Sequence, residues 1–276
     1  MSGARKVTLD KRGPIAWMTL NRPDKLNALD QDSVDLIAQH VEDVDGDPTI
    51  RAMVVSGAGR AFCAGGDLAM IEPLLGDRIA FDRFLTTWND AFDALEACRV
   101  PTVAAVDGIT FAGGIELTHV CDFVVLGDDV RIGDQHANFG LFPAGGSIQR
   151  LARLVGARRA KWIIMSGELI SPQQALDWGL ANALVPTGDV LAEAERMAAL
   201  LASKSSSLNW EIKRGVLEDL HLDVASAMAA ERPHALDHVT GEDQRIGIKA
   251  FVDRTVPTFA ARASAHTSPQ IGAEPA

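Results

Sequence analysis

The chain has 276 residues, of which 47% are hydrophobic and 23% charged, and its formal net charge is -11. This length is enough for one large domain, or for a domain with a smaller C-terminal piece, around a sizeable hydrophobic core. The acidic balance argues against a nucleic-acid-binding protein, since such proteins usually carry a basic excess.

The predicted elements begin with two alternating stretches. Residues 6–10 and 15–20 flank a turn signal and indicate a β-hairpin. After a loop at 21–29, Asp30 or Asp32 can cap a helix. The apolar residues of that helix recur at helical spacing, at Val34, Ile37, Val41 and Val44. Residues 52–57 are then typical of a short buried strand that ends in glycine.

Strands and helices continue to alternate further along the chain. We expect a loop at 57–68, a helix at 78–97 and a strand within 101–108. Residues 113–120 indicate a buried helix that opens on glycines, and 122–133 indicate two short strands around a turn. Such alternation predicts an α/β fold with a largely parallel sheet.

From about residue 145 onward the pattern is helical, with one short extended piece at 181–186. The sequence pattern changes again near residue 200, and the last dozen residues look like a solvated tail. We therefore expect three parts, which are an α/β core over 1–200, a helical region over 201–262 and a tail over 263–276.

The first loop that can carry chemistry contains Ala64, Gly65 and Gly66, which have little or no side chain, so a ligand can approach the backbone closely. Asp67 can cap the following helix, whose first N–H groups lie at the positive end of the helix dipole. The loop predicts an anion or oxyanion site, with a tight strand-to-helix turn as the alternative. Neither GxGxxG nor a P-loop occurs, which disfavours a nucleotide site.

The second such loop leads into Gly113 and Gly114, which can present N–H groups at a helix start, with Glu116 in the first turn. Glu116 can simply favour the helix dipole. In buried surroundings its pKa would instead be raised, as a general acid or base requires. His119 follows one turn later, and Glu-x-x-His can ligate a metal, but no second set is present. We expect no metal site and a hydrogen-bonded core histidine at 119.

The cysteines Cys63, Cys98 and Cys121 have no CxxC spacing. This spacing predicts neither disulfides nor a zinc site and favours a reducing compartment. The N-terminus lacks the apolar run of a signal peptide, and no stretch approaches the roughly 18 apolar residues that span a membrane. We expect a cytoplasmic protein without membrane or nucleic-acid partners.

Several ordered stretches of the chain resemble the crotonase superfamily, the enoyl-coenzyme A hydratases and isomerases, over about residues 5–260. The matching stretches are 20–29, 59–68, 101–117, 121–133, 140–156, 166–186 and 242–259. The resemblance implies a spiral of ββα turns with a C-terminal helical region that forms trimers and often hexamers. It also implies an acyl-CoA thioester substrate, as in fatty acid metabolism, with coenzyme A as part of the substrate and no other cofactor.

The resemblance also implies roles for individual residues. Gly66 and Gly113 match the positions whose N–H groups polarise the thioester carbonyl, and Glu116 matches the first of two catalytic glutamates. His136 stands where the second glutamate is expected. Contacts to substrate are implied for Lys25, Ala28, Ala64, Asp67, Leu68, Gly114, Phe251 and Arg254. The last two match positions that reach the coenzyme A of a neighbouring subunit. The acyl walls are expected to include Met70, Ile71 and Trp88.

The histidine at 136 leaves the reaction open. An imidazole can give or take a proton near neutral pH, so it can share acid and base work with Glu116. Its shape and charge states differ from those of a glutamate, which favours an altered reaction or substrate over standard hydration. The options are double-bond isomerisation, hydrolysis or retro-Claisen cleavage, and decarboxylation. A structural role for His136, and an acyl-CoA-binding protein with impaired catalysis, are the alternatives.

Overall fold

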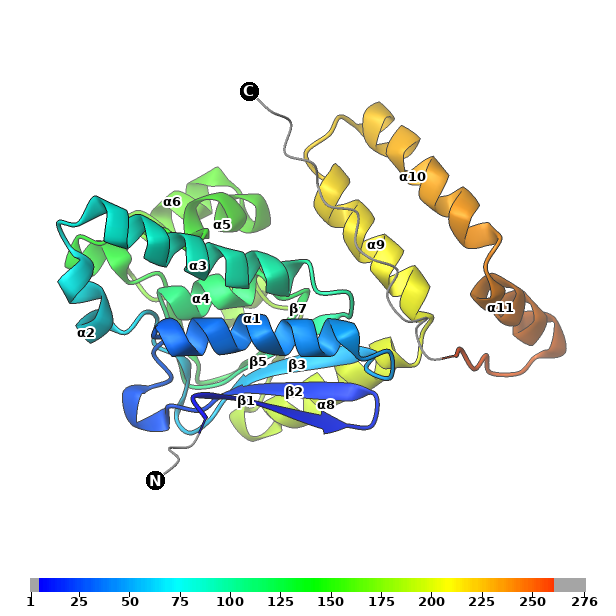
Figure 1. Cartoon of the computed structure of the whole chain (residues 1–276), viewed down its shortest axis with the longest axis horizontal. Helices are drawn as coiled ribbons and strands as arrows, with labels where there is room; N and C mark the ends of the chain where they lie inside the picture. The colour runs from blue at the N-terminus through cyan, green and yellow to red at the C-terminus, as the bar shows by residue number, and fades with distance from the viewer. Residues whose placement is uncertain (1–4, 261–276) are drawn as a thin grey trace.

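The computed structural model describes residues 5–260 as an α/β core with a group of C-terminal helices beside it (Figure 1). A six-stranded sheet crosses the core in the order β1-β2-β3-β5-β7-β9. The strands are β1 (Val7–Arg12), β2 (Ile15–Leu20), β3 (Ala52–Gly57), β5 (Thr102–Val106), β7 (Phe123–Gly127) and β9 (Ala183–Val185). The pair β1–β2 is antiparallel and every other pair is parallel, so the predicted hairpin and parallel sheet are confirmed.

A second, three-stranded parallel sheet consists of β4 (Ala61–Cys63), β6 (Ile109–Phe111) and β8 (Arg131–Gly133). The prediction of loops at β4 and β6 was wrong, because three residues are too few to show the alternation that marks a strand. The two strands predicted within 122–133 exist, but β7 and β8 lie in different sheets. Strands β4 and β6 lead directly into the two glycine-containing segments.

Helices cover both faces of the large sheet. One face packs against α1 (Gln31–Gly46), α3 (Arg78–Glu96) and α4 (Gly113–His119), and the other against α8 (Val190–Ala202). The Asp30 side chain accepts a hydrogen bond from the Ser33 amide and caps α1, as one of the two predicted aspartates. Because both faces are covered, β3 and β5 are buried throughout apart from Gly57, which explains their continuous apolar runs.

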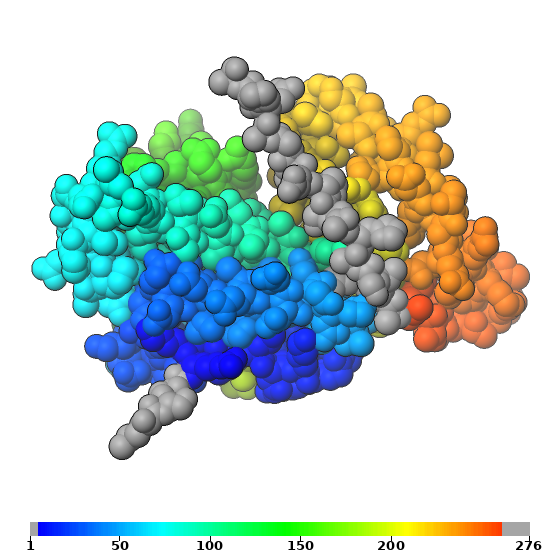
Figure 2. All heavy atoms as spheres, in the orientation of Figure 1, coloured from blue at the N-terminus to red at the C-terminus, as the bar shows by residue number. Residues whose placement is uncertain are grey.

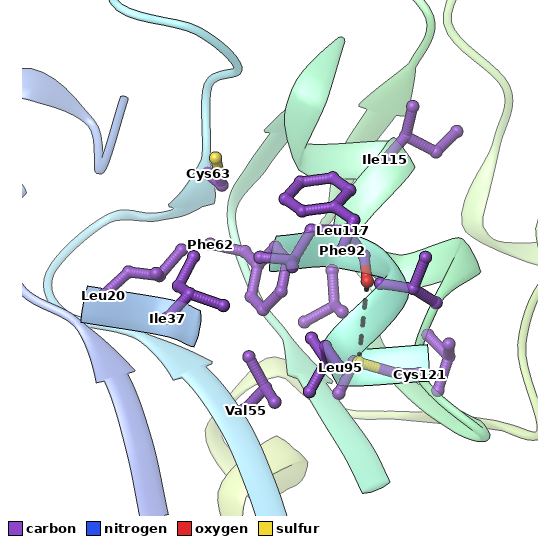
Figure 3. Packing of buried hydrophobic residues seen from close by; sticks show 14 of the residues in the cluster. Leu20, Ile37, Val55, Phe62, Cys63, Phe92, Leu95, Ile115, Leu117 and Cys121 are labelled. Carbon is purple, nitrogen blue, oxygen red and sulfur yellow. Dashed lines mark hydrogen bonds between the residues drawn. The ribbon is translucent and has the colours of Figure 1, made fainter. Parts of the chain in front are cut away.

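The larger core cluster lies between the sheets and these helices. Figure 3 shows Phe62 of β4, Phe92 of α3 and Leu117 of α4 among its members. Cys121 donates a hydrogen bond through Sγ to the Leu117 carbonyl over 3.5 Å. All three cysteines are free and buried, and burial raises the pKa of Cys63 and of Cys121 to about 12. These thiols therefore stay protonated and are poor nucleophiles.

Short helices complete the core. They are η1 (Pro23–Lys25), α2 (Leu68–Ile71), η2 (Glu72–Leu74), η3 (His136–Phe139), α5 (Ser147–Val155), α6 (Ala157–Ser166), α7 (Pro172–Asp177) and η4 (Thr187–Asp189). The Asp67 side chain accepts from the Ala69 amide and caps α2, as expected. None of the helices between residues 5 and 260 is long and apolar enough to cross a bilayer.

The C-terminal helices are α9 (Ser206–Asp219), α10 (Val224–Val239) and α11 (Glu242–Asp253). They lie beside the core in Figure 1, and α10 and α11 lie at the right of the molecule in Figure 2. The boundary predicted near residue 200 falls at the end of α8, the last helix that packs on the sheet. The predicted tail over 263–276 lies outside the described residues.

Candidate active site

A cavity of about 670 Å³ lies where the second sheet meets α2, α3, α4 and η3. Its lining brings together residues that are more than 100 positions apart in the chain. The predicted site residues among its lining are Lys25, Ala28, Ala64, Gly66, Asp67, Leu68, Gly113, Glu116 and His136. Ile71 and Trp88, two of the three expected acyl-wall residues, also line it.

Four predicted residues do not line this cavity. Gly114 packs against the backbone of Cys63, and an added Cβ would lie 2.1 Å from that carbonyl oxygen. The lack of a side chain at Gly114 therefore permits this close packing. Met70 packs against the hydrophobic core instead of the cavity. Phe251, on α11, is 86% exposed, and Arg254 caps the same helix.

The segment that presents Lys25 and Ala28 to the cavity is held by Asn27. This side chain is buried, and its amide donates hydrogen bonds to the carbonyl oxygens of Ala58 and Ala61 over 2.9 and 2.7 Å. Asn27 has a φ of 56°, in the left-handed region that asparagine tolerates better than most residues. The buried side-chain amide of Asn27 thus fixes the conformation of this segment, which contains no β-strand.

The backbone around Gly66 is oriented by a bridge to Leu29. The Leu29 amide donates to the Gly65 carbonyl, and the Asp67 amide donates to the Leu29 carbonyl, each over 2.8 Å. Because the flanking peptide groups take up this pairing, the N–H of Gly66 itself faces away from Leu29. It donates to no acceptor within residues 5–260.

Gly113 is the first residue of α4, so its N–H has no intrahelical acceptor. The preceding Ala112 has φ 48° and ψ -117°, a conformation that costs on the order of 1–3 kcal/mol for a residue with a Cβ. A Cβ added to Gly113 would lie 3.3 Å from the Cα of Gly65. The two glycine segments therefore touch, and both open into the same cavity.

The indole of Trp88 packs against three glycines at once. A Cβ added to Gly113 would lie 2.7 Å from Cζ2, and one added to Gly66 would lie 3.7 Å from Cη2. At Gly145 an added Cβ would lie 2.7 Å from Nε1. The indole of Trp88 thus fills the space that side chains at positions 66 and 113 would occupy, behind the two peptide segments that face the cavity. Sequence reasoning placed Trp88 in the acyl wall but gave no signal for this packing.

Glu116 lies in the first turn of α4 and is only 2% exposed. Its Oε1 accepts hydrogen bonds from the amides of Gly145 and Ser147 over 3.0 and 3.3 Å. Burial raises the pKa of Glu116, and the positive charge of His136 opposes this only in part. Within the described chain Oε2 makes no hydrogen bond, which leaves it available to a reactant.

His136 also lines the cavity, and its side chain is hydrogen-bonded to Asp134. Its Nδ1 lies 2.8 Å from Asp134 Oδ1, and its backbone amide donates to the same oxygen over 3.2 Å. Burial by itself lowers the pKa of His136, but the bond to Asp134 and the charges of Asp134 and Glu116 outweigh burial and raise it. Sequence reasoning missed Asp134, although a carboxylate two residues before a candidate histidine was a usable signal.

The chain is similar to known proteins over most of its length. The family model for enoyl-CoA hydratase/isomerase matches residues 10–262. The chain belongs to this family. A probable enoyl-CoA hydratase of Mycobacterium bovis is 31% identical, covering 93% of this chain and 98% of the relative. A short-chain-enoyl-CoA hydratase of Clostridium acetobutylicum is 30% identical, covering 90% of this chain and 95% of the relative.

Solved structures confirm the fold of this family member. DspI of Pseudomonas aeruginosa superposes with a TM-score of 0.88 at 30% identity, covering 94% of this chain and 98% of DspI. The crotonase-type α/β fold with its C-terminal helical region is therefore confirmed, and the protein is an enzyme of the hydratase/isomerase type.

In the described chain, His119, the last residue of α4, lacks the hydrogen bond that was expected for it. It is buried, but neither ring nitrogen has a hydrogen-bond partner within residues 5–260. Burial lowers the pKa of His119 to about 4, so the side chain is neutral at physiological pH. Among the described residues no group of three or more His, Cys, Asp or Glu side chains is placed to hold a metal ion.

We expect His119 to make this enzyme sensitive to acid. Its pKa is depressed in the folded state, so stability is complete above the unfolded value near 6.5 and falls as the pH drops towards about 4. The difference in pKa corresponds to about 3 kcal/mol at most. His119→Leu should therefore lose less stability between pH 7 and pH 4 than the wild type in urea unfolding. The exposed His221→Leu is the control, and an unchanged pH dependence for His119→Leu would contradict this expectation.

Proposed function

We propose that this protein acts on an acyl-CoA thioester, holding the thioester oxygen with the N–H groups of Gly66 and Gly113 and moving protons with Glu116 and His136. One observation carries this proposal. Two N–H groups that have no acceptor within residues 5–260 share a cavity with Glu116 and His136. Paired donors of this kind stabilise the negative charge that develops on an enolate or oxyanion.

The histidine alone favours an altered reaction, but the relatives named as enoyl-CoA hydratases support the reversible hydration of a 2-enoyl thioester as the reaction to propose. Water adds its oxygen to the β-carbon while Glu116 accepts a proton from that water. The electron pair of the double bond moves towards the thioester oxygen and then returns as His136 delivers a proton to the α-carbon. The same two groups can move a proton between carbons of the acyl chain, which is double-bond isomerisation.

The walls of the cavity support an apolar acyl group. Carbon-rich side chains from α2, α3, β6, η3 and the segments after η2 and η3 line the cavity. They include Ile71, Leu75, Phe81, Phe84, Leu85, Phe111, Phe139, Leu141 and Phe142. Apolar walls with a few polar groups are typical of small-molecule sites. Lys25 supplies a positive charge at this cavity, which suits the anionic coenzyme A part of the substrate.

We further propose a homotrimer, or a hexamer made of two trimers, in the cytoplasm. The helices α10 and α11 expose many large apolar side chains, which would be covered by contacts between subunits. They are Val224, Met228, Leu236, Val239, Ile248, Phe251 and Val252. Such contacts would also allow Phe251 and Arg254 to reach the coenzyme A bound by a neighbour, and the molar mass in solution measures the assembly.

The proposal is tested by screening acyl-CoA thioesters and following the product mass. We expect a gain of one water from a 2-enoyl thioester, or an unchanged mass with a change in absorbance for isomerisation. His136→Gln should lower turnover about 10²-fold or more, since general acid–base groups contribute about 10²–10⁴-fold. The exposed His221→Gln is the matched control.

The same screen separates the alternatives. Free coenzyme A would indicate hydrolysis of the thioester, and loss of carbon dioxide would indicate decarboxylation. Cleavage of a carbon–carbon bond in a β-keto thioester, with water added and coenzyme A still attached, would indicate retro-Claisen cleavage. Tight binding without conversion of any thioester would indicate an acyl-CoA-binding protein and would overturn the proposed activity.

A further inference from the structure

We infer that Asp134 is a positioning residue that grips the Nδ1 edge of His136 and thereby directs Nε2 into the cavity. The geometric part of this inference stands on the structure, and only its catalytic consequence rests on the proposed function. Neither the family resemblance nor the comparisons assign any role to Asp134.

The first support is the geometry of the contact. Asp134 follows the last residue of β8, so a sheet strand fixes its backbone. Its Oδ1 accepts from both the backbone amide and the Nδ1 of His136, over 3.2 and 2.8 Å. Two bonds to one residue restrict the rotation of the imidazole. Nε2 lies on the other edge of the ring, and it has no partner within residues 5–260 while the side chain lines the cavity.

The second support is the burial of the carboxylate. Asp134 is 0% exposed, and His136 is the only basic side chain in the described chain that forms an ion pair with it. Burial by itself would raise the pKa of Asp134, but the hydrogen bond and the charge of His136 outweigh burial and lower it. Neither Asp134 Oδ2 nor the nearby Ser147 hydroxyl makes a hydrogen bond within residues 5–260. A buried carboxylate with so few partners is costly, so the pair with His136 carries most of its compensation.

The consequence is a defined protonation state on the cavity side. When His136 is positively charged, Nδ1–H donates to Asp134 and Nε2–H faces the cavity as a proton donor. When Nε2 has given up its proton, Nδ1–H still donates to Asp134, so the lone pair of Nε2 faces the same point and can take a proton back. The charged groups whose fields act on His136 are Asp134 and Glu116. Both favour the protonated ring.

The test replaces Asp134 with asparagine, which keeps the shape but removes the charge, and it needs no substrate. In protein with ¹⁵N-labelled histidine, His136 is identified by the signal that His136→Gln lacks. We expect wild-type His136 to titrate above its ordinary value and to carry its neutral proton on Nδ1. In Asp134→Asn we expect its titration to move down by about 1–3 units, the size of effect that a neighbouring charge produces.

Kinetics supply the second readout. If His136 donates a proton, the alkaline limb of kcat/KM should move down in Asp134→Asn by the same amount as the titration, with kcat reduced more than KM is raised. The control is Asp122→Asn, since Asp122 bonds Lys213 and Thr102 away from the cavity. This control can lose stability, but neither the titration of His136 nor the pH profile should change.

The outcomes separate the inference from the proposed function. A His136 signal that titrates at the same pH and keeps the same tautomer in Asp134→Asn would overturn the inference. A shifted titration in an enzyme that converts no acyl-CoA would support the role of Asp134 and would overturn the proposed function alone.

Discussion

Replacing Glu116 with glutamine is expected to reduce turnover by about 10²–10⁴-fold without loss of the fold. The amide oxygen of glutamine can still accept from the Gly145 and Ser147 amides, so the local hydrogen bonds persist. Glutamine lacks the carboxylate, whose Oε2 takes up and releases a proton in the proposed reaction. Steady-state kinetics on the thioester found in the screen would measure the change, and the exposed Glu42→Gln is the matched control.

The same substitution should also stabilise the protein at neutral pH. The pKa of Glu116 is raised in the folded state by burial, so ionisation of Glu116 favours the unfolded chain. The contribution of Glu116 to stability is complete below its pKa in the unfolded chain. It is lost as the pH rises through its pKa in the folded protein. In urea unfolding, the stability of Glu116→Gln relative to the wild type should therefore increase as the pH rises through this window. Full activity, or a gain in stability that is independent of pH, would contradict the assignment.

Replacing Gly113 with alanine is expected to abolish most activity and to destabilise the fold. The new Cβ would lie 2.7 Å from Cζ2 of Trp88 and 3.3 Å from the Cα of Gly65. An indole packed in the core has little room to move, so the first turn of α4 must shift and carry its N–H with it. We expect overpacking to cost about 1–3 kcal/mol and turnover to fall by about 10²-fold or more.

A double-mutant cycle identifies the cause of that loss. Trp88→Leu removes the indole that the new Cβ meets, so the stability losses of Gly113→Ala and Trp88→Leu should add up to more than the loss of the double variant. Gly46→Ala, at an exposed helix position with no atom within 4 Å of the added Cβ, should leave activity unchanged. Strictly additive stability losses would show that Trp88 does not press on Gly113.

Much of the fold follows from local pattern. Helix α1 repeats its apolar residues with the helical period over several turns, and one cap aspartate marks its start. Strands β3 and β5 are continuous apolar runs because helices cover both of their faces. The strands β4 and β6 escaped prediction because each has only three residues. They pair within the small sheet that also contains β8. Their formation depends on the path of the chain and leaves no periodic signal.

The sequence by itself determined the main helices and the parallel sheet. It also indicated Gly66, Gly113, Glu116 and His136, because short motifs keep reactive groups and small residues at fixed spacing. Only the tertiary structure decided that Asp134 holds His136, that Gly114 serves packing, and that His119 is left without a hydrogen bond. The physical reason is that periodicity reports which face of an element is buried. Contacts between side chains and backbone from separate elements, such as Trp88 against Gly113, exist only once those elements have packed together.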